Sequence, residues 1–317
     1  TKTDTLSLVL TLEEIGRVSP SLAVIVSVHC SLFCYSILKF GTEKQKKKYL
    51  SRAAKGEILG AFSLTEPGAG SDVSALKTKA KRQGDFYLLN GTKSWVTSGN
   101  DAEASILFAL SEGVNKPSAF IIEKNFPGFR VSKVEDKMGL HSSPTAEFTL
   151  EDCRVPAENL LGEEGKGTSI ALQGLDLSRI GIAAQSVGLA DRAIEDAVRY
   201  AKQREAFGQK IAEFEAIQFM LADMCTLRDA ARLLTYQAAE INDRGKCSTK
   251  ESSMAKLFAS EAANKIAAMA LQIHGAYGYS REFFIEQLYR DARVLTIYEG
   301  TSEIQRLIIS RQLLKEP

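Results

Sequence analysis

The sequence predicts an α+β protein of several domains: a helical N-terminal domain, a middle antiparallel β domain and a C-terminal four-helix bundle. Apolar residues recur every three or four positions near both ends of the chain, as in amphipathic helices. Short β-branched and aromatic runs replace that spacing in the middle. A chain of 317 residues is long enough for two or more domains. We place the domains at residues 1–57, 58–160 and 161–317.

The first region, residues 1–57, is predicted to be helical. Apolar residues follow helical spacing from Leu8 to Ile15, and Gly41 ends one helix before Thr42 caps the next. The basic run at 44–48 is expected to form a solvated helix face. No signal or transit peptide opens the sequence, and the chain begins within a predicted helix. We therefore expect an N-terminal piece of this domain to be missing.

The second region, residues 58–160, has the character of β-structure. Runs at 86–89, 105–108 and 119–122 are rich in β-branched and aromatic residues. Turn signals lie between or after them at Asn90-Gly91, Glu112-Gly113 and Pro127-Gly128. Strands at short spacing, without long helices between them, predict an antiparallel barrel or sandwich.

The third region, residues 161–317, returns to helical spacing. Apolar stripes run through 187–201, 214–224 and 254–273. Breaks at Phe207-Gly208, Arg244-Gly245 and 275–278 separate the stripes. Long amphipathic helices joined by short turns predict a four-helix bundle.

Composition and charge narrow the range of functions. The 40 basic and 39 acidic side chains give a net charge of +1, so no basic excess points to a nucleic-acid partner. The five cysteines are odd in number and scattered, which argues for a reducing compartment. His29, Cys30 and Cys34 lack a fourth ligand at zinc-motif spacing, so we expect no metal. We find no run of about 18 apolar residues and expect no membrane span.

Two segments of the middle region are candidates for binding a ligand. In Thr65–Asp72, two glycines allow close backbone approach, and amides beside hydroxyls can hold phosphate. A plain β-turn is the alternative, and Val73 stands where a dinucleotide fingerprint needs a third glycine. The only tryptophan, Trp95, can stack on a flat ring while Thr97 donates to it, or it can be a core residue at a strand end.

Two segments of the third region carry acids. Asp176 is predicted near the start of the first bundle helix, where it can favour the macrodipole and pair with Arg179. Glu299 lies in a loop before a helix capped by Thr301 or Ser302. In an apolar pocket, desolvation raises the pKa of such a carboxylate and makes it a general base. An exposed loop acid is the alternative.

Taken together, five segments resemble the acyl-CoA dehydrogenase family, particularly its short-chain and short/branched-chain members. They are Thr65-Glu-Pro-Gly-Ala-Gly-Ser-Asp72, Asn90-Gly-Thr-Lys-Ser-Trp-Val-Thr97, Glu151-Asp-Cys-Arg-Val-Pro156, Arg290-Asp-Ala-Arg293 and Ile297-Tyr-Glu-Gly-Thr-Ser-Glu-Ile-Gln-Arg306. The resemblance covers about residues 6–314 and implies the same order of helical, β and bundle domains. It also implies that several tens of residues are missing at the front.

The resemblance implies that the chain binds FAD and an acyl-CoA. The residues that match the family's FAD site are Phe62, Leu64, Thr65, Gly70, Ser71, Trp95, Val96, Thr97, Thr301, Ser302 and Glu303. Four more would meet the FAD of a neighbouring subunit, because family members are commonly homotetramers: Arg204, Phe207, Gln272 and Gly275. The matches to the acyl-CoA site are Ser71, Asp176, Arg179 and Gly300.

The resemblance also implies a reaction. Glu299 would remove the α-proton of the thioester while the β-hydrogen leaves as hydride to the flavin, as in fatty acid beta-oxidation. The product is a trans-2-enoyl-CoA, and electrons pass to an electron-transferring flavoprotein. Some relatives carry the base at the position of Ser178, which cannot serve. The expected compartment is the cytoplasm in a bacterium and the mitochondrial matrix in a eukaryote.

Three residues depart from the family's pattern: two of them concern the FAD of a neighbouring subunit, and the third lies in a turn beside the β domain. Glu215 replaces a frequent glutamine near the neighbouring FAD, Ala276 replaces the second glycine of a pair, and His141 replaces an arginine. We expect weaker FAD retention, since a carboxylate near a diphosphate opposes binding. An oxidase or a non-catalytic flavoprotein on the same fold is the alternative function.

Overall fold

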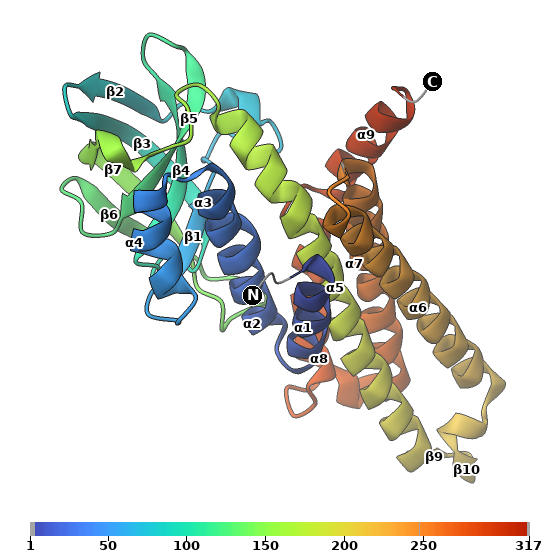
Figure 1. Cartoon of the computed structure of the whole chain (residues 1–317). Helices are drawn as coiled ribbons and strands as arrows, with labels where there is room; N and C mark the ends of the chain where they lie inside the picture. Colours follow the sequence, from blue (N-terminus) through green and yellow to red (C-terminus); the bar gives the residue numbers. More distant parts are fainter. Residues whose placement is uncertain (1–3, 247, 316–317) are drawn as a thin grey trace. The chain divides into compact units, whose positions relative to one another are not determined.

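The computed structural model describes residues 4–246 and 248–315 (Figure 1). Its contacts group the chain into two compact units. The bundle unit comprises Thr1–Val24, Lys137–His141 and Arg179–Pro317, and the sheet unit comprises Ile25–Asp136 and Ser142–Ser178. Two helices, α2 (Pro20–Ser27) and α5 (Gly167–Gln203), contribute to both units. The domain bounds predicted from the sequence stay a prediction.

The sheet unit is built on eight strands. They are β1 (Gly60–Ser63), β2 (Lys79–Gln83), β3 (Phe86–Thr97), β4 (Ala104–Ser111), β5 (Lys116–Glu123), β6 (Phe129–Val134), β7 (Thr145–Pro156) and β8 (Leu160–Leu161). Their order is β6-β7-β3-β2-β4-β5-β8, with β1 paired to β4. Both β1 and β2 run parallel to β4, so the sheet is mixed and the antiparallel prediction is corrected. The long connection between β1 and β2 allows them to run in the same direction.

Two of the three predicted turns are confirmed. Glu112-Gly113 lies in the β4–β5 hairpin, and Pro127-Gly128 precedes β6. The turn predicted at Asn90-Gly91 is wrong, because β3 continues through it with a register shift against β7. Gly91 has φ 149°, and a Cβ there would lie 2.5 Å from the Thr78 hydroxyl oxygen. The pair is a bulge that needs glycine.

Helices pack against this sheet. They are the end of α2, the π-helix η1 (Val28–Cys34), α3 (Tyr35–Phe40), α4 (Glu43–Ala53), and the short 3₁₀ turns η2 (Val73–Ala75) and η3 (Ala157–Asn159). Thr42 and Gln45 form the capping box of α4, which confirms the predicted cap. A core cluster joins Phe33 and Ile37 of these helices to Ile106 and Phe108 of β4.

The segment Pro20–Phe40 is one candidate for a membrane span among the described residues, which the apolar runs of the sequence did not predict. Its 21 residues are helical and reach a mean hydropathy of 1.9, so length and composition alone would allow a span. Inside the protein, 56% of this stretch is buried. The core helix of a soluble protein has the same properties, so one such segment is weak evidence for a membrane.

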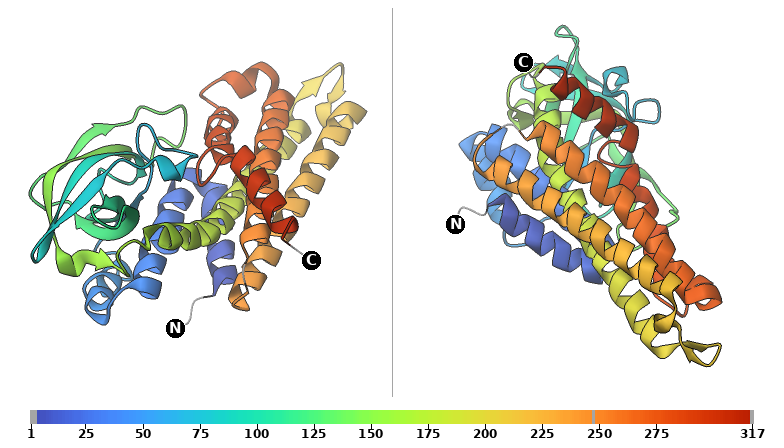
Figure 2. Two further views of the ribbon diagram at one scale, coloured as in Figure 1. Left: turned by 90° about the horizontal axis from the view of Figure 1, so that it is seen from above. Right: turned by 90° about the vertical axis from the view of Figure 1, so that its right-hand side faces the viewer.

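The bundle unit is helical. Beside the C-terminal part of α5 it contains α1 (Thr5–Val18), the hairpin β9–β10 (Glu205–Ala206, Gln209–Lys210), η4 (Ile211–Glu213), α6 (Glu215–Asp243), α7 (Thr249–His274), η5 (Gly275–Tyr279), α8 (Ile285–Arg293), η6 (Val294–Thr296) and α9 (Ser302–Leu313). Helices α6 and α7 run side by side (Figure 2), and α7 also packs against α8 and α9. The predicted breaks at Phe207-Gly208, Arg244-Gly245 and 275–278 are confirmed.

Small residues and buried charges fix this packing. Gly188 of α5 lies against α1, where a Cβ would be 2.1 Å from the Glu13 carbonyl oxygen. Arg232 of α6 donates to the Glu13 carboxylate at 2.8 Å. On α7 the buried face carries mainly Ala and Ser, whereas Met254 of the predicted stripe is 36% exposed. The predicted stripe is therefore buried only in part, at Ala262, Ile266 and Ile273.

Candidate active site

The first candidate segment follows β1 in the sheet unit. The Glu66 and Ala69 backbones exchange two hydrogen bonds of 3.0 Å, so a tight turn is present. A Cβ at Gly68 or Gly70 would meet no atom within 4 Å, which leaves this backbone open to a ligand. Thr65 is half-buried and Ser71 is exposed. The segment therefore forms a tight turn whose backbone is also open to a ligand, so the two interpretations do not exclude each other.

A buried ion pair fastens this segment to β3. Lys93 Nζ lies 2.7 Å from Glu66 Oε1, and the two side chains are 0% and 5% exposed. Lys93 also donates to the Leu64 carbonyl at 3.1 Å, and Glu66 accepts the Thr78 N–H at 3.0 Å. Burial lowers the pKa of Lys93 to about 8, although Glu66 partly offsets the effect. Burial opposes the charge of Glu66, but the bonds from Lys93 and Thr78 outweigh it and lower its pKa.

Trp95 lies on the surface beside that segment. Its backbone has φ 59° at the second register shift of β3, and its indole is 60% exposed. The core alternative for Trp95 is thus wrong. Ser94 N–H donates to the Thr65 carbonyl at 2.9 Å, which brings Thr65 beside Trp95. Val96 is 1% exposed and packs in the core, so only its backbone can face a ligand.

Three further sheet-unit candidates, Phe62, Leu64 and Thr97, are half-buried. Phe62 of β1 contacts Phe108 with a ring separation of 5.0 Å, and Leu64 lines a small pocket with residues of β4 and α5. Thr97 is half-buried at the end of β3. The structure therefore gathers Thr65, Trp95 and Thr97 on neighbouring segments.

Four bundle-unit candidates lie around the ends of α5 and α7. Tyr200 stacks on His274 at 4.4 Å, which places these two ends together. Arg204 lies over the Tyr277 ring at 5.6 Å. Phe207 is 96% exposed in the β9–β10 turn. Gln272 and Gly275 are exposed as well, so all four are available to a partner molecule.

The turn that carries Glu299 is strained and closely held. Glu299 has φ 53° and Gly300 has φ 95°, and the first value is uncommon for a residue with a side chain. Gln305 Nε2 donates to the carbonyl oxygens of both residues, at 3.0 and 2.9 Å. Lys256 Nζ donates to the Gly300 carbonyl at 2.7 Å. A strained turn persists when its surroundings fix it in this way.

The residues on either side anchor the same turn. The Tyr298 hydroxyl donates to Gln185 Oε1 of α5 at 2.6 Å. The Thr301 side chain accepts the Ile304 N–H and caps α9, which confirms the first of the two predicted caps. Glu299 itself is half-buried. Three helices, α5, α7 and α9, therefore hold the candidate base.

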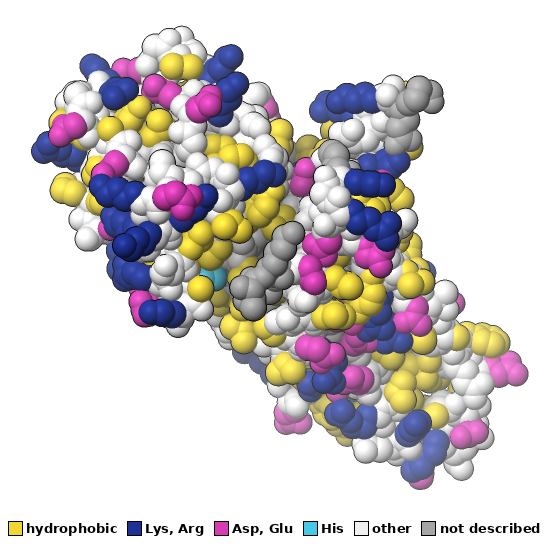
Figure 3. Space-filling model, in the orientation of Figure 1, with side chains coloured by type: hydrophobic (Ala, Val, Ile, Leu, Met, Phe, Trp, Pro, Cys, Tyr) yellow, Lys and Arg dark blue, Asp and Glu magenta, His cyan; other side chains and the backbone are white. Residues whose placement is uncertain are grey.

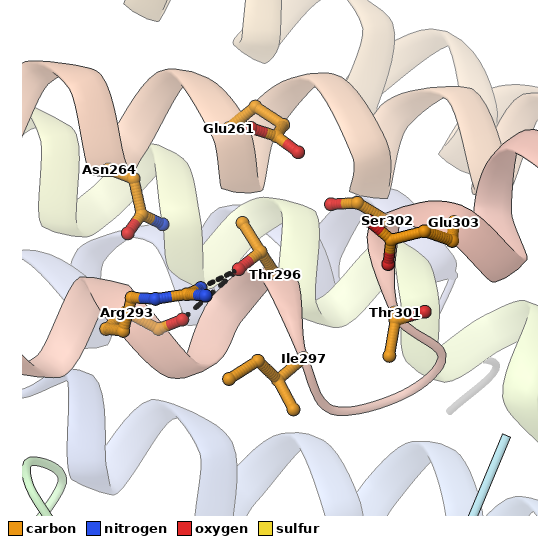
Figure 4. A pocket seen from close by; sticks show the side chains of 8 residues that line it. All are labelled: Glu261, Asn264, Arg293, Thr296, Ile297, Thr301, Ser302 and Glu303. Carbon is orange, nitrogen blue, oxygen red and sulfur yellow. Dashed lines mark hydrogen bonds between the residues drawn. The ribbon is translucent and has the colours of Figure 1, made fainter.

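A pocket opens beside this turn. Its volume is about 360 Å³, and Figure 4 shows its lining side chains: Glu261, Asn264, Arg293, Thr296, Ile297, Thr301, Ser302 and Glu303. Ser302 is buried, and its hydroxyl has no hydrogen-bond partner within the described chain. An unpartnered buried hydroxyl at the start of α9 suits a polar ligand group.

The second acidic candidate lies deeper in its helix than predicted. Helix α5 begins at Gly167, so Asp176 is well inside it, and the interpretation as a helix-start acid is wrong. Asp176 belongs to the sheet unit, where it is half-buried, and Arg179 belongs to the bundle unit, where it is 3% exposed. Ser178 is fully buried.

The half-buried side chains of His29 and Cys34 contact one another. His29 Nε2 lies 3.6 Å from Cys34 Sγ, and the other ring nitrogen accepts the Gly60 N–H at 3.0 Å. Burial raises the pKa of Cys34 to about 12, so its thiol is not a ready metal ligand or nucleophile. Across residues 4–246 and 248–315, no three His, Cys, Asp or Glu side chains gather as a metal site.

Comparison with known proteins gives the family. Models of the acyl-CoA dehydrogenase N-terminal, middle and C-terminal domains match residues 1–57, 61–153 and 165–314. An acyl-CoA dehydrogenase of Bacillus subtilis (strain 168) is 52% identical over 314 residues, 98% of this chain and 83% of that protein. The chain belongs to the acyl-CoA dehydrogenase family.

Solved structures of similar fold also support membership of this family. Butyryl-CoA dehydrogenase from Megasphaera elsdenii superposes with a TM-score of 0.97 at 45% identity, over 99% of this chain and 83% of that one. A chain from a structure described as the electron transferring flavoprotein of Acidaminococcus fermentans superposes with a TM-score of 0.98 at 47% identity. The match covers 100% of this chain and 84% of that one. This acyl-CoA dehydrogenase is a FAD-dependent oxidoreductase acting on CH–CH groups.

The residues present fit the flavin. The exposed indole of Trp95 offers a flat face, the Gly68–Gly70 backbone is open, and the Ser302 hydroxyl lacks a partner in the described structure. The role of each of these residues stays a prediction. Of the three departures, Glu215 and Ala276 are exposed, and His141 accepts a hydrogen bond from Arg290 at 3.0 Å.

Sequence reasoning missed the residues that hold the base. Lys256, Gln305 and Gln185 are all fully buried. Lys256 and Gln185 lie outside the five family segments, and Gln305 lies in the last of them but was given no role. A signal was present for Lys256, since it falls among Ser and Ala on one helical face of 252–267. A long cation on a stripe of small buried residues indicates a specific partner.

Proposed function

We propose that this acyl-CoA dehydrogenase oxidises a short or short-branched acyl-CoA to the trans-2-enoyl-CoA, with Glu299 as the base. The observation that carries the proposal is the strained, helix-anchored turn of Glu299 and Gly300. A fixed turn keeps one carboxylate at one place, as proton abstraction requires. Similarity to butyryl-CoA dehydrogenase supports a short substrate.

The chemistry divides between residues and cofactor. Glu299 accepts the α-proton, and its own backbone N–H is a donor for the thioester oxygen, where one good donor contributes about 3–4 kcal/mol. When bound, FAD supplies the acceptor for the hydride from the β-carbon. The resemblance implies that Thr65, Trp95, Thr97 and residues 301–303 would hold the cofactor.

Substrate and partners follow from the same proposal. Ser71, Asp176, Arg179 and Gly300 would contact the acyl-CoA. An electron-transferring flavoprotein would take up the electrons, which the likeness to the Acidaminococcus structure supports. A homotetramer would place Arg204, Phe207, Gln272 and Gly275 at the FAD of a neighbouring subunit, and their exposure supports this.

The first test compares wild type with Glu299→Gln. Without oxygen, butyryl-CoA or 2-methylbutyryl-CoA should bleach the flavin absorption of wild type, and their relative rates rank the substrates. Glu299→Gln should slow bleaching by about 10²–10⁴-fold or more, because the amide cannot accept the proton. Glu282→Gln, an exposed acid remote in sequence from the turn, is the matched control.

The outcomes separate the alternatives. A yellow protein that neither acyl-CoA bleaches, or a variant as fast as wild type, contradicts Glu299 as the base and favours a non-catalytic relative. Rapid reoxidation by air after bleaching identifies an oxidase instead.

A further inference from the structure

Lys256 is a buried cation that contacts the turn carrying the candidate base. It lies on α7 with 0% exposure, between Ala255 and Leu257 and one turn before Ala259 and Ser260. A lysine is rarely buried to this extent without a specific partner, because desolvation of the ammonium is costly. None of the roles proposed for FAD or acyl-CoA uses it.

The partner of Lys256 is the base's own turn. Its Nζ donates to the Gly300 carbonyl at 2.7 Å, and Gln305 donates to the same oxygen at 2.9 Å. A charged donor forms a stronger bond than a neutral amide does. Lys256 therefore contributes the stronger of the two bonds on that carbonyl, next to a residue with φ 53°.

The charges around Lys256 come from each element packed against it. They are Glu299 of the turn, Arg179 of α5, Glu261 of α7 and Glu303 of α9. Burial lowers the pKa of Lys256 to about 8, and the attraction of Glu299 is the largest effect that opposes this. The ammonium is thus mainly charged at neutral pH and discharged at moderately alkaline pH.

We propose that Lys256 is the positioning residue of the base: its ammonium fixes the Gly300 carbonyl and favours the ionised carboxylate of Glu299. Resting on the proposed function, this assigns a second buried group to the reaction. The attraction between Lys256 and Glu299 is mutual, so removing the cation makes the carboxylate easier to protonate. Discharging Lys256 at high pH weakens the hold on the turn.

Two features of the pH profile follow. In Lys256→Met the acid limb of kcat/KM should move upward by about one pH unit, which is about tenfold lower activity on that limb. In wild type kcat should decline above about pH 8, where Lys256 discharges. Lys256→Arg keeps its charge at all these pH values, so it should restore the acid limb and lack the alkaline decline.

A titration without substrate tests the inference separately from the reaction. Infrared difference spectra of the FAD-loaded enzyme follow the protonated carboxyl band of Glu299, which is assigned by its loss in Glu299→Gln. The midpoint of this band should be about one pH unit higher in Lys256→Met than in wild type. Lys265→Met removes an exposed lysine from the same helix and should leave the midpoint unchanged.

Lys256→Gln keeps a donor to Gly300 without the charge, so it replaces Lys256→Met if that variant does not fold. An unchanged midpoint in the neutral variants, with wild-type pH limbs, overturns the inference even where Glu299→Gln is inactive. A shifted midpoint in an enzyme that oxidises no acyl-CoA supports the inference and contradicts the proposed function.

Discussion

Glu66 and Lys93 show how one buried ion pair can stabilise a candidate ligand-binding segment. The carboxylate receives Lys93 and two backbone N–H groups, from Lys77 at 2.7 Å and Thr78 at 3.0 Å. Such a pair adds little over an apolar pair, but losing one partner is costly because a charge stays buried alone. The pair therefore determines where the backbone of Thr65–Asp72 lies.

Glu66→Gln should lower the free energy of unfolding by about 3 kcal/mol, because Lys93 is left without its counter-charge. Chemical denaturation measures the change. The double variant Glu66→Gln/Lys93→Met should lose less than the sum of the single variants. Strict additivity would show that the two groups do not interact.

The pKa shifts of Glu66 and Lys93 determine how the stability of the protein changes with pH. The lowered pKa of Glu66 gives stability that is present above its ordinary value of 4.5 and is lost as the pH falls. Lys93 titrates near 8 in the fold and at 10.5 in its ordinary state, so the unfolded chain binds more protons between these values. Its contribution to stability therefore rises with pH across that window, and Lys93→Met should remove the rise.

At the scale of single elements, β3 carries two departures from a regular strand. The first is the bulge at Gly91, and the second turns Trp95 outward with φ 59°. Bulges re-aim side chains, often beside a site. Lys93 lies between these two positions. One strand therefore supplies both the buried lysine that pairs with Glu66 and the exposed indole of Trp95.

Gly91→Ala should destabilise the protein by about 2–4 kcal/mol, since it combines positive φ with overpacking. A Cβ at this position would lie 2.8 Å from the Thr78 Cα, which is backbone and cannot swing away. The matched control is Gly84→Ala, where φ is 62° but no atom lies within 4 Å, and about 1 kcal/mol is expected. Thermal midpoints compare them, and equal shifts would contradict a packing role for the bulge.

Local signals predicted local elements well. The Thr42–Gln45 capping box depends on residues three apart, and it forms as predicted. Asn90-Gly91 carries the signal of a two-residue hairpin, yet β7 pairs with β3 on both sides of it and keeps the strand running. A partner strand some 60 residues away leaves no mark in the local sequence.

For the whole molecule, the order helix, sheet, bundle was predictable from periodicity, but the path of the chain was not. Residues 137–141 return to the bundle unit, where the Asp291 carboxylate accepts the Leu140 N–H at 2.5 Å. The candidate base was predictable from a motif, whereas Lys256 depends on α7 and the turn meeting in space.

The surface of the whole molecule carries charges of both signs. Lys and Arg lie among Asp and Glu over the face shown in Figure 3, as the net charge of +1 leads one to expect. Association with a partner therefore depends on particular residues rather than on an overall field. We expect Glu215, exposed at the start of α6, to be one such residue.

Glu215→Gln should tighten FAD binding by roughly fivefold in the assembled enzyme, because it removes a repulsion of about 1 kcal/mol from the diphosphate. Fluorescence titration of the FAD-free protein measures the affinity, and Ala276→Gly tests the second departure alongside. Glu240→Gln, exposed further along the same helix, is the control. Tight binding by wild type, unchanged in both variants, would remove the idea that these departures weaken retention.

The left-handed backbone of Glu299 has a consequence for any library randomised at this position. Glycine adopts φ 53° without steric cost, so a screen that rewards only folded protein should enrich glycine there. Under the function proposed for Glu299, a screen that rewards turnover must keep the acid and accept the strain. Selection for folding and selection for catalysis therefore oppose one another at this single codon.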